Sequence, residues 1–570
     1  MASISHRTHS FYVTAFIATL GCWTSLSIAQ VVIPPDADTS RLRTAPLPLP
    51  SVPNFDLRLE TPEKSAVPKA VDELSFVVTD ILVEGIQHYP TAVAHQLFNP
   101  LVGKRVTLSD IREIADKLEA RYRQDGFFLV RVFIPPQQVK DGIFKVRVIE
   151  GYIDSVSAEG GTEAARLLAE KMLASVVNKR PIDLPSLERA LLLINDMPGV
   201  RGSGILRQSE QLGASELVLN LSDLPSRSVV VGINNTASKI MGELATLANL
   251  TIQNPFDSHP GQLSLGLNAS ADVERLRALN GQYAAAIGAD GLVFSIGGLI
   301  ANARPGGSLK ALDIESNSSS LSSRVRYALM RGRITSTYFE TGVSVNYSRT
   351  TLLGSELTLD RSTVLDMALS VADNRWNGST EGSLGVARGV SWFSANGNDA
   401  ERPSVKGFAP DFTKLKINLV RQQGLPGQFS LQVVGQGQWT ADKLLAGEQV
   451  FFGGVGLGRA YDTGAVIGDR GAGMMIELRR EIYPDQWRVL PEGSLQAYLF
   501  TDYARASLLP NAATGAAAMS NSLHSIGVGL RYRNYTGLSV DFIIADARRT
   551  IQSTDPKPNP RVLLLLTKAF

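Results

Sequence analysis

Residues 261–270 read GQLSLGLNAS, in which apolar side chains alternate with small polar ones over the whole stretch. Successive side chains of a β-strand point to opposite faces, so this order would give a strand with one apolar and one polar face. The apolar face would carry Leu263, Leu265, Leu267 and Ala269, and the polar face Ser264, Gly266, Asn268 and Ser270.

The same alternation continues from about Arg227 to Phe570, where helical periodicity disappears. Further examples are YFETGVSVNYS (338–348), TKLKINLV (413–420) and IGVGLRYR (526–533). We count sixteen such segments, about one per 21 residues, which suits transmembrane strands of roughly ten residues plus their connections.

A soluble β-sandwich is the alternative, because its strands alternate as well. Sandwich strands run only about 5 to 6 residues, whereas these segments are longer and the chain carries an export signal. A sheet spans lipid only when it closes, since every backbone polar group then needs a partner. The sequence therefore predicts an all-β transmembrane barrel of about 16 antiparallel strands over residues 226–570.

The bulk composition agrees with a barrel and excludes some other classes. The chain has 570 residues, a net charge of +2 and 19% charged residues, so nothing suggests a nucleic-acid-binding protein. Mean hydropathy is +0.02, yet beyond the N-terminus no stretch reaches the ~18 to 20 apolar residues of a membrane helix. Interleaved apolar and polar residues give such a value in a large barrel.

The N-terminus resembles an export signal. Arg7 precedes a short apolar run, and Ser27-Ile28-Ala29 forms a small-x-small cleavage site, which predicts a signal peptide over residues 1–29. A membrane anchor is the alternative. Cys22 is the only cysteine and lies in this segment, so the mature chain would form no disulfide. Residues 30–74 are rich in proline and predict an extended linker, with room for a short plug helix around Asp36 to Arg43.

Two α/β units are predicted between the linker and the barrel. Residues 75–152 predict a strand, helices and two strands in that order. Thr107 would cap the start of a helix together with Asp110, and Gly126 would end that helix. Residues 153–225 repeat the pattern more weakly. A duplicated unit suggests a tandem binding module, and one α+β domain is the alternative.

No enzyme site emerges from the sequence. The six histidines lack metal-ligand spacing such as HExxH, and we find no phosphate-binding loop. The segment GVGLG (454–458) resembles a dinucleotide fingerprint only superficially, because Arg459 takes the place of its last glycine and no βαβ pattern surrounds it. We therefore expect no catalytic residue, no metal and no cofactor.

A glycine-rich stretch, FFGGVGLGRAYDTG (451–464), surrounds a single arginine, Arg459. It precedes GMMIELRREI, whose inward side would carry Glu477 and Arg479. In SLQAYLFTD (494–502) the apolar series Leu495, Ala497 and Leu499 would face lipid, so that Tyr498, Phe500 and Asp502 would face the lumen.

Four segments of the sequence resemble a known family. VRVFIPPQQVKDGIFKVRVIEGYI (130–153) and LERALLLINDMPGVRGSGILRQSEQLGASELVLNL (187–221) resemble the two POTRA modules of two-partner secretion transporters (TpsB, haemolysin-activator type) of the POTRA-barrel superfamily. The glycine-rich stretch resembles the family's Val-Arg-Gly-Tyr motif, and YLFTDYARA (498–506) its barrel-strand motif. Gly458, Ala460 and Ala504 depart from those motifs, whereas Arg459, Tyr461 and Asp502 match them.

The resemblance implies a loop that folds into the pore, with contacts between Arg459, Tyr461, Phe500 and Asp502. The loop glycines would let its tip approach the wall: Gly453, Gly454, Gly456 and Gly458. The alternative is an ordinary extracellular loop with a solvated arginine.

As a function, the resemblance implies an outer-membrane pore, with its POTRA domains in the periplasm. Through those domains the pore would bind a partner exoprotein of the haemolysin or adhesin kind and pass it outward in extended form. We expect outer-membrane lipid around a monomeric barrel and no nucleic acid. A barrel-assembly factor of the same superfamily is the main alternative, and a passive porin ranks lower because it needs no periplasmic portion.

Overall fold

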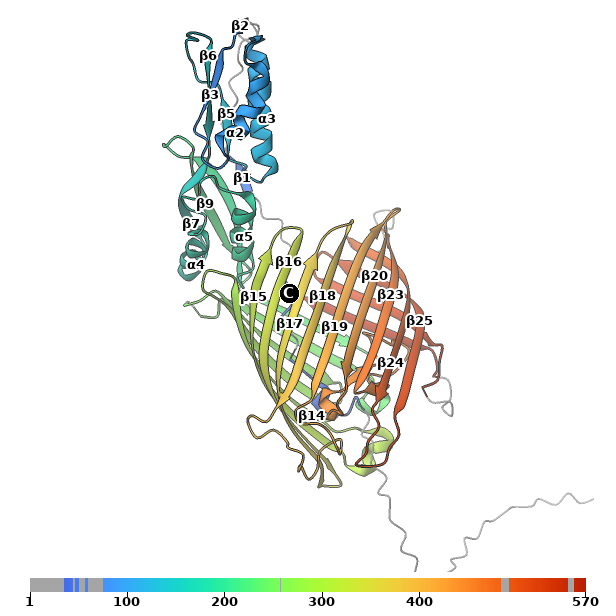
Figure 1. The fold of residues 1–570 in the computed structure, drawn as a ribbon. Helices are drawn as coiled ribbons and strands as arrows, with labels where there is room; N and C mark the ends of the chain where they lie inside the picture. Colours follow the sequence, from blue (N-terminus) through green and yellow to red (C-terminus); the bar gives the residue numbers. More distant parts are fainter. Residues whose placement is uncertain are drawn as a thin grey trace, which may run out of the picture.

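The computed structural model describes residues 35–44, 47–50, 57–59, 75–256, 258–482, 492–551 and 558–570. The export signal expected over residues 1–29 lies outside these residues, as does much of the expected linker. Two small α/β domains follow one another above one end of a large barrel (Figure 1).

Sixteen antiparallel strands form a closed barrel, because β10 pairs with both β11 and the last strand, β27. The expected barrel is therefore confirmed. Its strands are β10 (Arg227–Asn234), β11 (Ala245–Gln253), β12 (Gly261–Ser270), β13 (Leu276–Ile287), β14 (Leu292–Ala303), β15 (Glu315–Arg331), β16 (Thr335–Leu352), β17 (Ser355–Asp373), β18 (Gly378–Val390), β19 (Thr413–Leu425), β20 (Phe429–Thr440), β23 (Arg470–Ile482), β24 (Gly493–Leu508), β25 (Met519–Asn534), β26 (Leu538–Ala547) and β27 (Arg561–Ala569).

Side chains that alternate in the sequence point alternately to the outer wall and to the lumen of the barrel. Ile417 is 55% exposed on the outer wall of β19, and Leu499 is 58% exposed on that of β24. Phe500, the neighbour of Leu499 along β24, faces the lumen and is buried there against the loop that follows β20. Because the barrel has no free edge, every strand can cross lipid with its backbone groups paired.

The two ends of the barrel differ in the length of their connections. At the end that carries the α/β domains, adjacent strands are joined by short turns, such as 288–291, 332–334, 374–377 and 426–428. At the other end the connections 304–314, 391–412 and 441–469 are longer. Short turns on the periplasmic side and long loops outside are typical of bacterial outer-membrane barrels.

The first α/β domain contains β2 (Ser75–Val77), β3 (Asp80–Glu84), α2 (Thr91–Phe98), the 3-10 turn η2 (Asn99–Leu101), β4 (Arg105–Thr107), α3 (Leu108–Gln124), β5 (Arg131–Phe133) and β6 (Ile143–Ile149). Strand β3 pairs with β6 and β2 with β4, so the single strand expected at the start of residues 75–152 is divided between two sheets. Thr107 caps α3 in a reciprocal box with Asp110, and the hydrogen bonds from Thr107 lower the pKa of that carboxyl.

The second α/β domain contains β7 (Tyr152–Gly160), α4 (Glu163–Leu173), α5 (Leu184–Asn195), β8 (Val200–Gln208) and β9 (Ala214–Asp223). Its sheet has the order β1-β8-β9-β7. The first of these strands, β1 (Leu57–Leu59), comes from the proline-rich segment and pairs with β8 in parallel. The sheet edge at β8 is thus occupied by the chain itself.

A buried contact joins the second domain to the barrel rim. Both oxygens of Asp196 accept hydrogen bonds from the guanidinium of Arg331, at 2.7 Å each. Leu193 of α5 belongs to an apolar cluster that includes Ala328 and Tyr338 of the barrel. The domain is therefore docked by packing and by a charge pair at once, at the junction seen in Figure 1.

Candidate functional site

The connection between β20 and β23 folds back against the inner wall of the barrel. It contains the 3-10 turn η5 (Ala446–Glu448) and a small hairpin of β21 (Val450–Phe452) and β22 (Val466–Gly468). Its apolar side chains pack on inward residues of β24 and β25, in a cluster that includes Phe452, Leu457, Tyr461, Tyr498, Phe500 and Leu523. The lumen on this side is filled by the loop.

Three of the four loop glycines are required by the backbone. Gly453, Gly454 and Gly458 have positive φ angles of 119°, 85° and 108°. A Cβ at Gly453 would lie 2.1 Å from the carbonyl oxygen of Asp462, which no side chain can do. Gly456 faces open space and carries no such requirement.

Arg459 lies at the tip of the loop and is 3% exposed. Its Nη2 donates to Asp502 Oδ1 at 3.0 Å and its Nε to Oδ2 at 3.2 Å, while Nη1 donates to Glu477 Oε2 at 2.9 Å. Its backbone N–H also donates to Asp502, at 3.1 Å. A planar guanidinium can hold two carboxylates at once in this way, and an ammonium cannot.

Aromatic contacts complete the attachment of the loop. The guanidinium carbon of Arg459 lies 3.4 Å from the centre of the Phe500 ring, which is a close cation–π contact. The hydroxyl of Tyr461 donates to the carbonyl oxygen of Arg549 at 2.5 Å and lies 3.2 Å from that of His524. The structure thus brings Arg459, Phe500 and Asp502 into direct contact, while Tyr461 attaches the loop to the wall beside them.

The charges around Arg459 are balanced by a network on the wall. Glu477 also accepts a hydrogen bond from Arg479 at 2.6 Å and lies 3.5 Å from Arg531. Arg531 in turn pairs with Asp541 at 2.8 Å. Buried charges are tolerated when each has partners, so the loop tip is part of a closed set of pairs.

The proline-rich segment also enters the lumen. Within the range Asp36 to Arg43 it forms one 3-10 turn, η1 (Thr39–Arg41), at the end of the barrel away from the α/β domains. The N–H of Thr39 donates to Ser316 at 3.2 Å, and the hydroxyl of Ser318 donates to the Thr39 carbonyl at 2.9 Å. Further along, Arg326 donates to the carbonyl oxygen of Pro48 at 2.8 Å.

This N-terminal segment and the loop are tied to each other. Arg43 donates to Gly447 O at 2.7 Å and to Glu448 Oε1 at 3.2 Å. The other oxygen of Glu448 accepts from Lys414 of the wall at 2.8 Å. A polar cavity of about 480 Å³ remains between the segment and the wall. The lumen is therefore wide, polar and obstructed by two extended pieces of chain.

No pattern in the sequence predicted several of these contacts. Alternation put Glu477 on the inward face but did not pair it with Arg459. Nothing marked Arg326 or Ser316 as partners of the N-terminal segment. Nor did anything mark Asp469, which is 0% exposed and accepts hydrogen bonds from the N–H of Leu444 at the start of the loop and from the N–H of Leu509 in the connection after β24.

We expect the wild-type barrel to conduct ions weakly and irregularly in planar bilayers, because both segments occupy its lumen. Removing residues 450–466 should raise the conductance or destabilise the open state, and removing residues 36–49 should raise the conductance as well. Deletion of the exposed turn 512–516 is the matched control and should change nothing. One steady, porin-like conductance in all four proteins would contradict the obstruction.

No helix in the described ranges is both long and apolar enough to cross a membrane. The same residues contain no cluster of three or more histidine, cysteine or acidic side chains arranged to hold a metal ion.

Comparison with known proteins identifies related chains. The description "Haemolysin secretion/activation protein ShlB/FhaC/HecB" matches residues 213–532, and "POTRA domain, ShlB-type" matches residues 76–151. The heme/hemopexin transporter protein HuxB of Haemophilus influenzae (strain 86-028NP) is 23% identical over 83% of this chain and 84% of its own length. The outer membrane transporter CdiB of Escherichia coli is 25% identical over 38% of this chain and 34% of its own.

Solved structures show the same fold. The structure of CdiB from Escherichia coli has a TM-score of 0.70 at 18% identity and covers 90% of this chain and 93% of its own. The family match spans more than half of the chain, including most of the barrel and the loop that carries Arg459. The chain belongs to the family of haemolysin secretion/activation proteins, of the ShlB/FhaC/HecB type.

Proposed function

We propose that this chain is an outer-membrane transporter that moves a partner exoprotein from the periplasm to the cell surface by two-partner secretion. Its family and the transporters it is similar to support this class of function. The observation that carries the proposal is the lumen, which has a polar wall and is obstructed by segments that polar contacts hold in place. A barrel of about 16 strands encloses a path wide enough for an extended chain once those segments move.

Orientation follows from the connections. The short turns lie at the end that carries the POTRA domains, so these domains would sit in the periplasm and the long loops outside. The cargo would meet the POTRA domains first, enter the barrel beside them, and leave past the loop of Arg459. The sequence contains no phosphate-binding loop of the GxxxxGK type, and we infer that folding of the cargo outside drives its exit.

Reconstitution tests the proposal. The protein in liposomes should deliver its partner exoprotein to the opposite side, where added protease digests it. Liposomes with the 450–466 and 36–49 deletions report whether opening suffices for passage. Leakage of small solutes without any passage of the exported protein would instead support a passive porin.

We expect cargo recognition to reside in residues 75–223. The purified fragment should bind the N-terminal part of the exoprotein, because unpaired edge strands of its sheets can accept an added strand. A longer fragment, residues 50–223, should bind less tightly, since β1 already covers the edge of β8. Binding by the isolated barrel but not by the fragment would show that the roles are assigned wrongly.

A further inference from the structure

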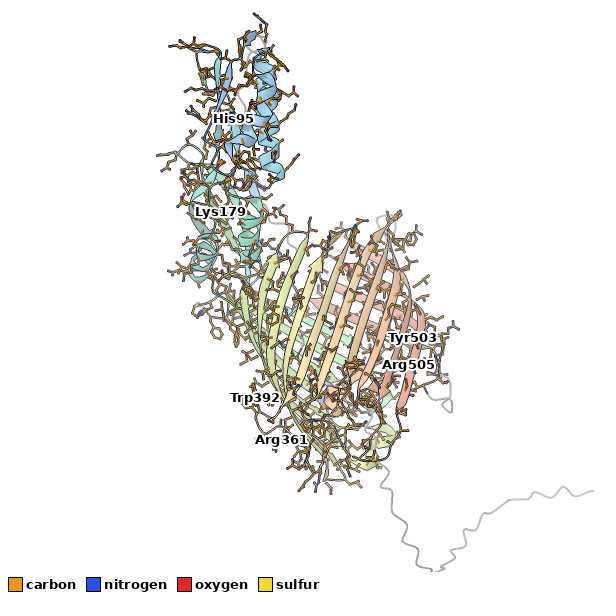
Figure 2. The ribbon with its side chains drawn as sticks, viewed as in Figure 1. His95, Lys179, Arg361, Trp392, Tyr503 and Arg505 are labelled. Carbon is orange, nitrogen blue, oxygen red and sulfur yellow. The ribbon has the colours of Figure 1, made fainter. Side chains whose placement is uncertain are left out.

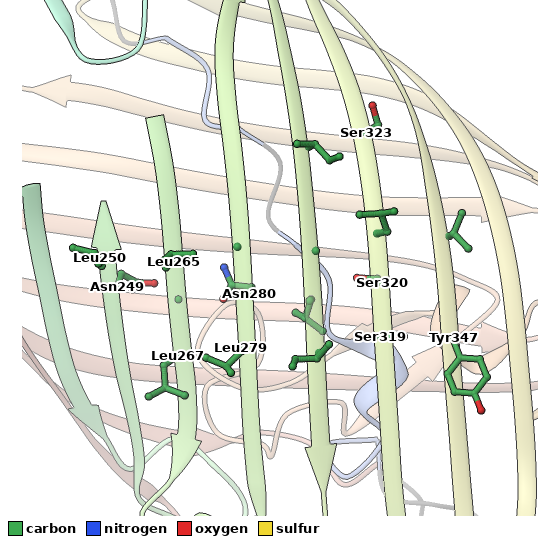
Figure 3. A pocket seen from close by; sticks show the side chains of 18 of the residues that line it. Asn249, Leu250, Leu265, Leu267, Leu279, Asn280, Ser319, Ser320, Ser323 and Tyr347 are labelled. Atoms are coloured by element: carbon green, nitrogen blue, oxygen red, sulfur yellow. The ribbon is translucent and has the colours of Figure 1, made fainter. Parts of the chain in front are cut away.

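The outer wall of the barrel carries a groove across β12 to β16 that has no part in the lumen (Figure 3). It encloses about 980 Å³, within the range of about 300–1,000 Å³ that ligand pockets occupy. Large apolar side chains on the lipid-facing side form its rims: Leu265, Leu267, Leu279, Ile296, Ile300 and Leu321.

Two paired glycines form the floor of the groove. Gly281 of β13 lies opposite Gly298 of β14. A Cβ built at Gly281 would lie 3.3 Å from Leu265 Cδ2, so the missing side chain belongs to the outer surface. Two small residues of β15, Ser319 and Ser323, continue the low surface. In the membrane such a recess is filled by apolar chain, because an empty gap loses the contacts of its lining atoms.

The groove leads to arginines at the extracellular end of the same wall. Arg277 lies two residues beyond Leu279 on β13, and Arg349 lies two residues beyond Tyr347 on β16. Arg361 of β17 lies opposite Tyr347, with its guanidinium 5.9 Å from the ring centre. All three arginines are exposed on the outer wall.

Two carboxylates near the mouth are already paired with arginines. Glu356 lies 3.0 Å from Arg349, and Glu315 lies 2.9 Å from Arg304. Within the described part of the chain, Arg277 and Arg361 have no carboxylate partner. The mouth of the groove is therefore positively charged.

Aromatic residues indicate the level in the membrane at which the mouth of the groove lies. Tyr347 and Phe393 both line the groove, and Phe393 is 70% exposed on the connection between β18 and β19. Its neighbour Trp392 and Arg361 lie at the end of the barrel far from the POTRA domains (Figure 2). Aromatic rings gather at the boundary between lipid and water, so the arginines stand at headgroup level and the groove reaches into the hydrocarbon below.

We propose that this groove binds an acyl chain of a lipid with two phosphates, of the lipid A class, in the outer leaflet. Strands lie about 4.8 Å apart, which puts Arg277 about 14 Å from Arg349 and about 19 Å from Arg361 along the wall. A headgroup with two phosphates can place one phosphate on each side of the groove, whereas a single phosphate would have to draw the side chains inward over it. Long arginine side chains can extend to such a headgroup from the membrane edge.

Native mass spectrometry of the purified full-length protein tests the site, with lipid A, monophosphoryl lipid A and phosphatidylglycerol as probes. Lipid A should bind most tightly. The double substitution Arg277→Gln with Arg361→Gln should weaken lipid A binding about 30-fold, from the usual contribution of a basic residue at a membrane surface. Ser319→Leu with Ser323→Leu should also weaken it by filling the groove with side chains that suit lipid. Arg388→Gln, an exposed arginine at the extracellular end of β18, is the matched control and should bind as wild type.

Four results would overturn the proposal. Unchanged lipid A binding by the arginine double variant would show that these arginines do not contact the headgroup. An equal loss in Arg388→Gln would make the attraction a general effect of charge, and phosphatidylglycerol bound as tightly as lipid A would exclude the two-phosphate headgroup. If the lipid-free protein is a dimer and the double substitution Ser319→Leu with Ser323→Leu dissociates it, the groove binds a second copy of the chain instead of a lipid. None of these readouts depends on secretion.

Discussion

Arg459→Ala is expected to remove most secretion while the protein still inserts in the outer membrane. The substitution leaves Asp502 without its charged partner and takes one partner from Glu477, in a site where all three side chains are buried. Breaking a buried pair by removing one partner costs about 3–5 kcal/mol, more than the pair itself contributes. The loop tip then has only its packing to hold it, and the ordered resting state of the pore is lost.

Companion variants separate the contact from simple loss of charge. Asp502→Ala should fail for the same reason, and Arg459→Lys should be impaired because an ammonium cannot hold both carboxylates and stack on Phe500. The double variant Arg459→Ala with Asp502→Ala should show a defect smaller than the sum of the single defects. Arg505→Ala is the matched control, since this exposed arginine lies on the outer face of β24, the strand that carries Asp502.

The measurement is exoprotein in the medium, set against the amount of folded barrel judged by its heat-dependent migration on gels. Strict additivity of the two single defects, or full secretion by Arg459→Ala, would show that the contact between Arg459 and Asp502 has no role in secretion.

Asp196→Ala is expected to uncouple the second α/β domain from the barrel. The side chain of Arg331 is 0% exposed and that of Asp196 only 9%, so the substitution leaves a buried guanidinium without its bidentate partner. We expect secretion to fall by most of its value while the exoprotein still binds, because cargo held by a detached domain is no longer delivered to the barrel. Hydrogen exchange should rise in α5 and at the end of β15.

The same junction provides a control pair. Glu188 and Arg333 lie 3.0 Å apart, but the side chain of Arg333 is 46% exposed. Glu188→Ala should therefore have little effect, since exposed pairs contribute about 0–1 kcal/mol. Asp196→Ala with Arg331→Ala should recover part of the loss. Equal effects of Asp196→Ala and Glu188→Ala on secretion and exchange would show that the buried pair does not hold the domain.

Much of this architecture could be predicted because the information is local. A period of two residues decides which side chains share a face, so Phe500 and Asp502 could be assigned to the lumen before any pairing was known. The cap of α3 likewise lies within Thr107 and the three residues that follow. Glu477 shows the limit, because its inward direction followed from alternation but its contact with Arg459 did not.

The contacts that escaped prediction join residues that are far apart in the chain. Arg326 and Pro48 are 278 residues apart, and Arg331 and Asp196 are 135 apart. A single sequence carries no periodic signal for such pairs, which depend on where a linker runs after the barrel has closed. The strand β1 is another case, since Leu57 of the proline-rich segment pairs with Gly204 of β8, which lies far along the chain.

The sequence by itself determined the barrel, the direction of its side chains and the two α/β units, because apolar alternation and helix capping act between neighbours along the chain. Only the tertiary structure decided that Arg459 holds two carboxylates, that the N-terminal segment enters the lumen, and that a groove in the outer wall ends at unpaired arginines. These features arise where separate strands meet around a closed sheet, and closure brings together residues whose proximity no local pattern records.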